Sequence, residues 1–239
     1  MAFPLRLTAD LAHGLAARAL GARRSNPLIF NFVPNGNSRA MAASIGSPIV
    51  WIGGAEPLEQ PEIPSVANAI AAAGRYVFLQ TNGLLLRRRI HELRPLPRLF
   101  LTIRFDGCET AHDARADQEG TFRSALEGIR TARLSGFLIC AQMILHAERG
   151  VAELRELHRE LQKLDLDGFL ISPATSATDL QGAVAAARGQ FLGYRWALLS
   201  RLLDSAILPA PATLREPSGT LDSPLLEVPS PAGESVQIQ

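Results

Sequence analysis

The sequence predicts an α/β fold of six parallel strand–helix units, arranged either as an open doubly wound sheet or as a curved partial barrel. Short apolar segments alternate six times with segments of helical periodicity over about 150 residues. Polar residues and glycines follow several of these strands, as they do at the mouth of a barrel. No Gly-x-Gly-x-x-Gly motif follows the first strand, which argues against a dinucleotide-binding sheet.

The composition is that of a folded globular chain with little net charge. The 239 residues are 47% hydrophobic and 20% charged, with a formal net charge of +1. This balance implies neither nucleic acid nor an anionic membrane surface, so we expect a small-molecule ligand or a protein partner. No apolar run reaches the roughly 18–20 residues of a membrane span, and no secretory signal is apparent, so we expect a cytoplasmic protein.

Residues 1–26 are predicted to form an N-terminal helical extension. Apolar residues share one face of a helix over residues 8–22. Thr8 is its expected N-cap and Gly21 its expected end. This helix is expected to pack against the main body of the protein.

The barrel is predicted to span residues 27–175. Helices are expected at 63–73, 84–93, 121–134 and 151–164. The connection at 34–47 is barely as long as a parallel crossover requires, so its helix is expected to be a stub or absent. The six expected strands are 27–33, 49–52, 76–79, 99–105, 137–145 and 169–171.

The C-terminal part is predicted to divide into a helix and a tail. Residues 176–206 contain one long, partly amphipathic helix, expected at 180–205. Residues 207–239 are rich in proline and serine and lose periodicity, so we expect a disordered tail.

The segment around the second strand is the most informative stretch. Its apolar run ends in Gly53 and Gly54, which permit a sharp turn or close approach of a ligand. Glu56 then stands at the carboxyl end of the strand, where α/β folds bind their ligands. An ordinary turn after a buried strand is the alternative.

The order of the motifs resembles the radical S-adenosylmethionine (SAM) superfamily. Segments 77–90 and 166–174 are most similar to its adenosylhopane synthase-like branch. The resemblance covers about residues 27–205, and it implies a partial (βα)6 barrel that holds SAM and a [4Fe–4S] cluster at its mouth. The motifs are Gly54-Ala55-Glu56-Pro57-Leu58, Thr81-Asn82-Gly83, Asp106-Gly107 with His112-Asp113, and Gly120-Thr121-Phe122.

The loop that carries the cluster cysteines in this family has lost them here. In the matching CxxxCxxC register, the three positions hold Gly36, Ala40 and Ala43. These side chains offer no thiolate to iron, and the two cysteines of the sequence, Cys108 and Cys140, belong to later strands. The resemblance therefore implies no cluster and no metal site, so reductive cleavage of SAM is not expected, whereas SAM remains a possible ligand.

Eight residues at the strand ends are candidates for binding SAM or another ligand. Glu56 can accept a charge-assisted hydrogen bond from the amino group of SAM, or it can be structural. Thr81 and Asn82 either contact the ligand or form an Asn-Gly turn. The resemblance places Arg104 and Asp106 near the ribose or carboxylate of SAM, although they can equally pair with each other. The eight are Gly53, Gly54, Glu56, Thr81, Asn82, Arg104, Asp106 and Ser172, the last near the family's adenine site.

Three functions remain open from the sequence, and none identifies a catalytic residue. The first is a cluster-less pseudoenzyme or accessory protein that binds SAM or another small ligand. The second is an acid–base enzyme on the same barrel, with Glu56, Asp106 and His112 at the mouth. The third is a cysteine-free version of an active radical SAM enzyme.

Overall fold

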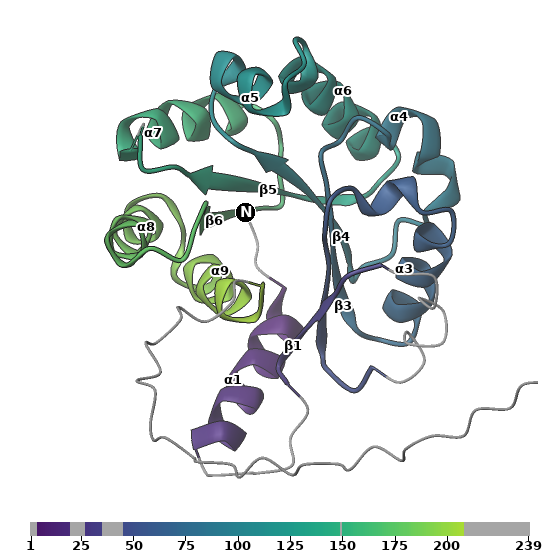
Figure 1. Ribbon diagram of the computed structural model, residues 1–239. Coiled ribbons are helices and arrows are strands. Elements are labelled where there is room, and N and C mark those ends of the chain that lie inside the picture. The colour runs from purple at the N-terminus through teal and green to yellow at the C-terminus, as the bar shows by residue number, and fades with distance from the viewer. Residues whose placement is uncertain (1–3, 20–26, 35–44, 149, 208–239) are drawn as a thin grey trace, which may run out of the picture.

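Six parallel strands form one curved sheet in which each strand pairs with its neighbours in the sequence. The computed structural model describes residues 4–19, 27–34, 45–148 and 150–207 (Figure 1). Consecutive parallel pairing in a curved sheet confirms the predicted partial barrel. The strands are β1 (Ile29–Phe32), β2 (Ile49–Ile52), β3 (Tyr76–Thr81), β4 (Leu99–Phe105), β5 (Leu138–Leu145) and β6 (Gly168–Pro173).

Helices cover both sides of this half-barrel. Most of them surround the convex side, whereas α1 and α9 lie on the concave side (Figure 1). The helices are α1 (Leu5–Ala19), α3 (Ile63–Ala72), α4 (Leu86–Arg89), α5 (Glu109–Ala116), α6 (Thr121–Leu134), α7 (Gly150–Leu161), α8 (Thr178–Phe191) and α9 (Tyr194–Ile207). Single 3-10 turns, η1 (Pro57–Glu59) and η2 (Ile90–Glu92), follow β2 and α4.

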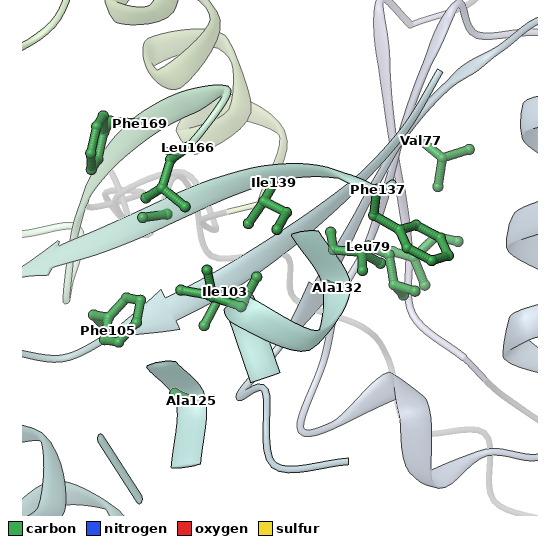
Figure 2. Packing of buried hydrophobic residues seen from close by; sticks show 14 of the residues in the cluster. Val77, Leu79, Ile103, Phe105, Ala125, Ala132, Phe137, Ile139, Leu166 and Phe169 are labelled. Atoms are coloured by element: carbon green, nitrogen blue, oxygen red, sulfur yellow. The ribbon is translucent and has the colours of Figure 1, made fainter. Parts of the chain in front are cut away.

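The larger core lies between the convex face of the sheet and the outer helices. Alternate strand residues such as Leu79, Ile103 and Ile139 point into it, and small residues such as Ala125 and Ala132 let α6 approach the sheet (Figure 2). Because a parallel sheet is covered on both faces, its strands are apolar at nearly every position.

The smaller core fills part of the concave side. The rings of Phe78 and Phe100 stack with centroids 4.9 Å apart, and Trp196 of α9 meets Phe100 edge-on at 6.3 Å. Leu7 and Leu11 of α1 belong to the same cluster. The concave face is therefore apolar where α1 and α9 cover it.

A buried network fixes α9 and α8 to β6. Arg188 of α8 donates from Nε to the carbonyl oxygen of Ile171 (2.9 Å) and pairs with Asp204 of α9. The Ser200 hydroxyl also donates to the Ile171 carbonyl (2.6 Å) and accepts from the Ile171 amide (3.0 Å). Moving α9 would separate Asp204 from Arg188 and leave a buried charge without its partner, which is costly. The network therefore holds α9 in one position.

The predicted single C-terminal helix is wrong, because the structure has two helices there. Leu192 caps α8 in an extended conformation, and α9 begins after Gly193. The break was not predicted, because apolar periodicity continues on both sides of it.

The N-terminal helix exists, but the prediction misplaced its start. It begins at Leu5, and the amide of Thr8 donates to the carbonyl oxygen of Pro4 within the first turn. Thr8 is therefore inside the helix and is not its N-cap. The predicted end at Gly21 lies outside the described residues.

Two further predictions fall outside the described residues. These are the short first crossover, whose residues 35–44 are not described, and the tail from 208 to 239. Within the described ranges, no helix combines the length and the apolar composition needed to cross a bilayer.

The contact between Gly168 and Trp196 yields a testable prediction. A Cβ atom at Gly168 would overlap the indole ring of Trp196, so Gly168→Ala should force α9 away from β6. We expect a loss of about 1–3 kcal/mol in the free energy of unfolding, measured by urea denaturation. Gly182→Ala, in α8 with open space at its Cα, is the matched control and should not destabilise the protein. An equally stable Gly168→Ala variant would contradict the packing of α9.

Candidate functional site

A cleft of about 750 Å³ lies at the carboxyl ends of the central strands. In a parallel α/β fold this is the edge at which ligands bind. Five of the eight candidate ligand-binding residues line this cleft, because their strands end side by side. The polar lining consists of Gly54, Glu59, Gln80, Thr81, Asn82, Arg104, Asp106, His112, Arg115, Gln118, Thr121 and His146.

Glu56 joins the ends of β2 and β3. Its Oε1 accepts hydrogen bonds from the Leu58 amide (3.0 Å) and the Thr81 hydroxyl (2.9 Å), and its Oε2 accepts from the Asn82 amide (2.7 Å). Burial raises the pKa of Glu56, although the three donated hydrogen bonds act in the opposite direction. The carboxylate therefore has protein partners on both oxygens and does not line the cleft.

Thr81, Asn82 and Gly83 form the turn after β3. The Thr81 hydroxyl accepts from the Gly83 amide (3.1 Å), and Oδ1 of Asn82 accepts from the Leu84 amide (3.0 Å). Gly83 has a φ of +84°, which an Asn-Gly turn provides. These contacts are those of the Asn-Gly turn that the sequence offered as one alternative. Both Thr81 and Asn82 also border the cleft.

Gly53 and Gly54 shape the backbone beside the cleft. A Cβ atom at Gly53 would lie 2.5 Å from Nε1 of Trp51 and 2.9 Å from Oε1 of Gln80, so no larger residue fits. Gly54 has a φ of +122°, in a region that favours glycine, and it is exposed to the cleft.

Arg104 and Asp106 form a bidentate ion pair at the end of β4. Nε of Arg104 lies 2.9 Å from Oδ2 of Asp106, and Nη2 lies 2.8 Å from Oδ1. Nε2 of His146 donates to the same Oδ1 at 3.1 Å. Burial raises the pKa of Asp106, but Arg104 and His146 outweigh it and hold this pKa below its usual value.

His112 of α5 lies next to this group. Its Nδ1 accepts from the backbone amide of Asp106 (3.1 Å), and its ring packs against Phe105 and Phe122. Burial lowers the pKa of His112, which keeps the imidazole neutral.

Ser172 lies on the concave side at the end of β6. Its hydroxyl accepts from Nε2 of Gln142 (3.2 Å). Burial raises the pKa of the nearby Asp204, and Arg188 and the Ser172 hydroxyl act in the opposite direction. Ser172 lines a second cavity, of about 290 Å³, beside the cleft.

The acid–base alternative is only partly assembled. Asp106 and His112 are in contact at the cleft, whereas the oxygens of Glu56 are already occupied by three donors. Nδ1 of His112 is likewise engaged by a backbone amide. Asp106 and His112 therefore border the same cleft, whereas Glu56 does not line it.

The cysteines do not fit an iron–sulfur cluster. Cys140 belongs to the concave core, is fully buried, and burial raises the pKa of its thiol well above the usual value. Cys108 packs against the convex core, and its Sγ lies 3.8 Å from the carbonyl oxygen of Glu153. Two thiols on opposite faces of a sheet cannot ligate one cluster. The loop positions Gly36, Ala40 and Ala43 lie outside the described residues, and the described ranges contain no group of three or more His, Cys, Asp or Glu that could hold a metal.

Sequence reasoning missed several residues of the cleft. His146 directly follows β5, so its position after a buried strand was a usable signal. Glu59 and Arg115 come from η1 and α5, where no strand end marks them, and only the folded chain brings them to the cleft.

Comparisons with known proteins agree with this architecture. A family model described as the radical SAM superfamily matches residues 38–172. Two curated proteins of Methanosarcina barkeri match part of the chain. An AdoMet-dependent heme synthase is 33% identical over 136 residues, which are 55% of this chain and 39% of that protein. An Fe-coproporphyrin III synthase is 26% identical over 98 residues, 41% and 25% of the two chains. The chain thus covers well under half the length of either relative.

A solved structure shares the fold. The crystal structure of Streptococcus suis SuiB superposes with a TM-score of 0.54 at 13% identity, over 76% of this chain and 51% of that chain. At this identity the likeness concerns the fold alone.

The role of Glu56 predicts the effect of removing one of its oxygens. Glu56→Gln replaces an acceptor with an NH2 group, which faces one of the three donors and leaves it unsatisfied. We expect a loss of about 1–3 kcal/mol in unfolding free energy, measured by urea denaturation. Glu59→Gln, at an exposed neighbouring position, should have little effect. Equal stabilities of the two variants would contradict the structural role of Glu56.

The lowered pKa of Asp106 predicts a pH-dependent contribution to stability. The ionised carboxylate stabilises the fold above its unfolded-state pKa of 3.8, and this stabilisation disappears as pH falls through the lower folded-state pKa. Asp106→Asn should therefore be less stable than the parent protein at neutral pH, with a difference that shrinks below pH 3.8. Urea denaturation at a series of pH values measures this, and a difference that grows on acidification would contradict the ion pair.

Proposed function

Because this chain belongs to the radical SAM superfamily, we propose that it binds SAM in the cleft at the carboxyl ends of the strands and works without a [4Fe–4S] cluster. The observation that carries the proposal is a polar cleft of about 750 Å³ at the family's ligand edge, in a chain whose two thiols lie on opposite faces of the sheet. The protein is then a SAM-binding pseudoenzyme or accessory protein.

The lining of the cleft suits the charges of SAM. SAM carries a sulfonium, an ammonium and a carboxylate group. Glu59 offers an exposed carboxylate for the ammonium group, and it takes the role expected of Glu56, whose oxygens are occupied. Arg115 also lines the cleft and contacts the Asp106 carbonyl oxygen (3.2 Å) and Glu148 (3.3 Å), and its remaining N–H donors can receive the carboxylate of SAM. Asn82 and Gln80 supply amides for the ribose.

The missing thiolates define what the protein does not do under this proposal. When bound, a [4Fe–4S] cluster supplies the electron for reductive chemistry on SAM, and it requires cysteine ligands. The sequence places no cysteine between residues 1 and 107. We propose that SAM binds as an intact ligand, so its occupancy can signal to a partner protein.

We also propose a narrower role within the superfamily. The relatives described above carry heme synthase and coproporphyrin synthase names, which favours a tetrapyrrole-related role over the adenosylhopane synthase branch. That observation covers only a fraction of each relative's length. The acid–base alternative draws support from the Asp106–His146 contact of 3.1 Å at the same cleft.

Calorimetric titration of the full chain with SAM tests the proposal. Ala116 lines the cleft and is exposed at the end of α5, so Ala116→Trp should fill the cleft without disturbing the core. We expect saturable SAM binding that weakens about tenfold or more in this variant, a cost of ~1.4 kcal/mol or more. Ala114→Trp, on the same helix and outside the cleft, is the matched control and should bind SAM as the parent does. Absence of binding at millimolar SAM would contradict the proposal.

A further inference from the structure

A groove of about 300 Å³ lies between the start of β1 and α9. Because β1 is the first strand of the sheet, the groove lies at one edge of the half-barrel. It is formed at the amino end of β1 and shares no lining residue with the cleft or the cavity at the carboxyl ends. Six residues line it: Pro27, Leu28, Ile29, Leu202, Ser205 and Ala206.

The lining of this groove is apolar and uncharged. Leu28 and Ile29 are only 4% and 7% exposed and belong to the concave core. Among the described residues that line the groove, Ser205 has the one polar side chain, and its hydroxyl donates to the Arg201 carbonyl oxygen (3.1 Å) within α9. A charged occupant would lose its hydration here without gaining a partner, so the groove suits an apolar segment.

The chain that follows α9 begins beside this groove. The helix ends at Ile207, one residue after Ala206, and Pro209 lacks the amide that would continue it. A proline also disfavours a helical conformation of the residue before it, here Leu208. The groove extends about 6 Å along α9 from Leu202 to Ala206, and two extended residues span about 7 Å. The residues that follow α9 are therefore within reach of the groove.

The composition of that segment matches the groove. Residues 208–214 read Leu-Pro-Ala-Pro-Ala-Thr-Leu and carry no charge. The Pro-Ala-Pro sequence favours an extended polyproline II conformation, which docks in apolar grooves at a low cost in conformational entropy. The other segment that adjoins the groove, residues 20–26 before Pro27, contains Arg23 and Arg24. Residues 208–214 are therefore the better occupant.

We propose that residues 208–214 dock in this groove of the same molecule, with their leucine and proline side chains against Leu28 and Ile29. The segment follows α9 directly, so its effective concentration at the groove is about millimolar, and weak apolar contacts suffice for occupancy. Docking would fix the end of α9, whose Asp204 and Ile207 line the cavity of about 290 Å³. The inference does not depend on SAM binding, because it concerns a different surface.

Methyl NMR of the full chain tests the docking. The double variant Leu208→Ser, Leu214→Ser should shift the methyl resonances of Leu28 and Ile29, because these side chains lose their apolar contacts. Leu28 and Ile29 are far in sequence from both substitutions, so the shifts report contact in space.

A second double variant is the matched control. Leu225→Ser, Leu226→Ser makes the same changes further along the chain and should leave the Leu28 and Ile29 resonances in place. All four leucines lie after α9, outside the two described cores, so neither variant removes a core residue.

Trypsin gives an independent measure of docking. Arg215 directly follows the segment and is the one basic residue in the sequence after α9. Ser205→Trp should fill the groove from its exposed rim and accelerate cleavage after Arg215 about tenfold, since cleavage follows the population of the open form. Ala185→Trp, at an exposed position of α8 outside the groove, is the matched control and should be cleaved at the parent's rate.

Two results would overturn the proposal. The first is unchanged Leu28 and Ile29 resonances in the Leu208→Ser, Leu214→Ser variant, with equal cleavage of the parent and Ser205→Trp. The second is a set of methyl shifts that revert on dilution, with a dimer detected by light scattering, because the segment of a second copy would then occupy the groove. SAM binding is scored separately by calorimetry, so either proposal can fail alone.

Discussion

A sheet curved into half a barrel has a concave face that must be covered, and the structure depends on how α9 does this. Its apolar residues cover one part of that face, with Trp196 packed on Phe100 and against Gly168. The ion pair of Asp204 with Arg188 fixes the helix to β6. Above the part that α9 covers, polar residues of the strands line a cavity beside the carboxyl ends of the strands.

The same strand ends are joined by hydrogen bonds that hold the site in shape without a ligand. Glu56 ties the turn after β3 to β2, and Asp106 ties β4 to the end of β5 through His146. These carboxylates were candidates for direct ligand contact, yet their oxygens have protein partners. Two other charged residues of the cleft come from outside the strands: Glu59 lies in the 3-10 turn η1, and Arg115 of α5 pairs with Glu148 at the edge of the site. The carboxylates of these two motifs thus occupy the expected positions in the fold, and their hydrogen bonds stabilise the loops around the site.

Most of the fold could be predicted from the sequence, because each parallel strand is an apolar run that ends at a glycine or a polar residue. The strands at 49–52 and 99–105 and the helix at 121–134 were placed correctly to the residue. The break at Gly193 and the start of α1 were not, since apolar periodicity continues through both and local preference cannot show where a helix docks. The pair of Asp204 with Arg188 was beyond the sequence, because it depends on how two separate helices pack against β6. Candidate residues at strand ends were predictable in position, and the Arg104–Asp106 pair was one of the stated alternatives, whereas the three donors around Glu56 were not predictable.

The central claim is that this radical SAM chain keeps the ligand site of its family without the means to hold a cluster. Anaerobic reconstitution of the full chain with iron and sulfide, followed by analysis of bound iron and acid-labile sulfide and by Mössbauer spectroscopy, tests it most directly. The account predicts no stoichiometric cluster, because the two thiols face opposite sides of the sheet. A [4Fe–4S] signature in proportion to the protein would contradict it, and would show that the chain recruits ligands from outside its own cysteines.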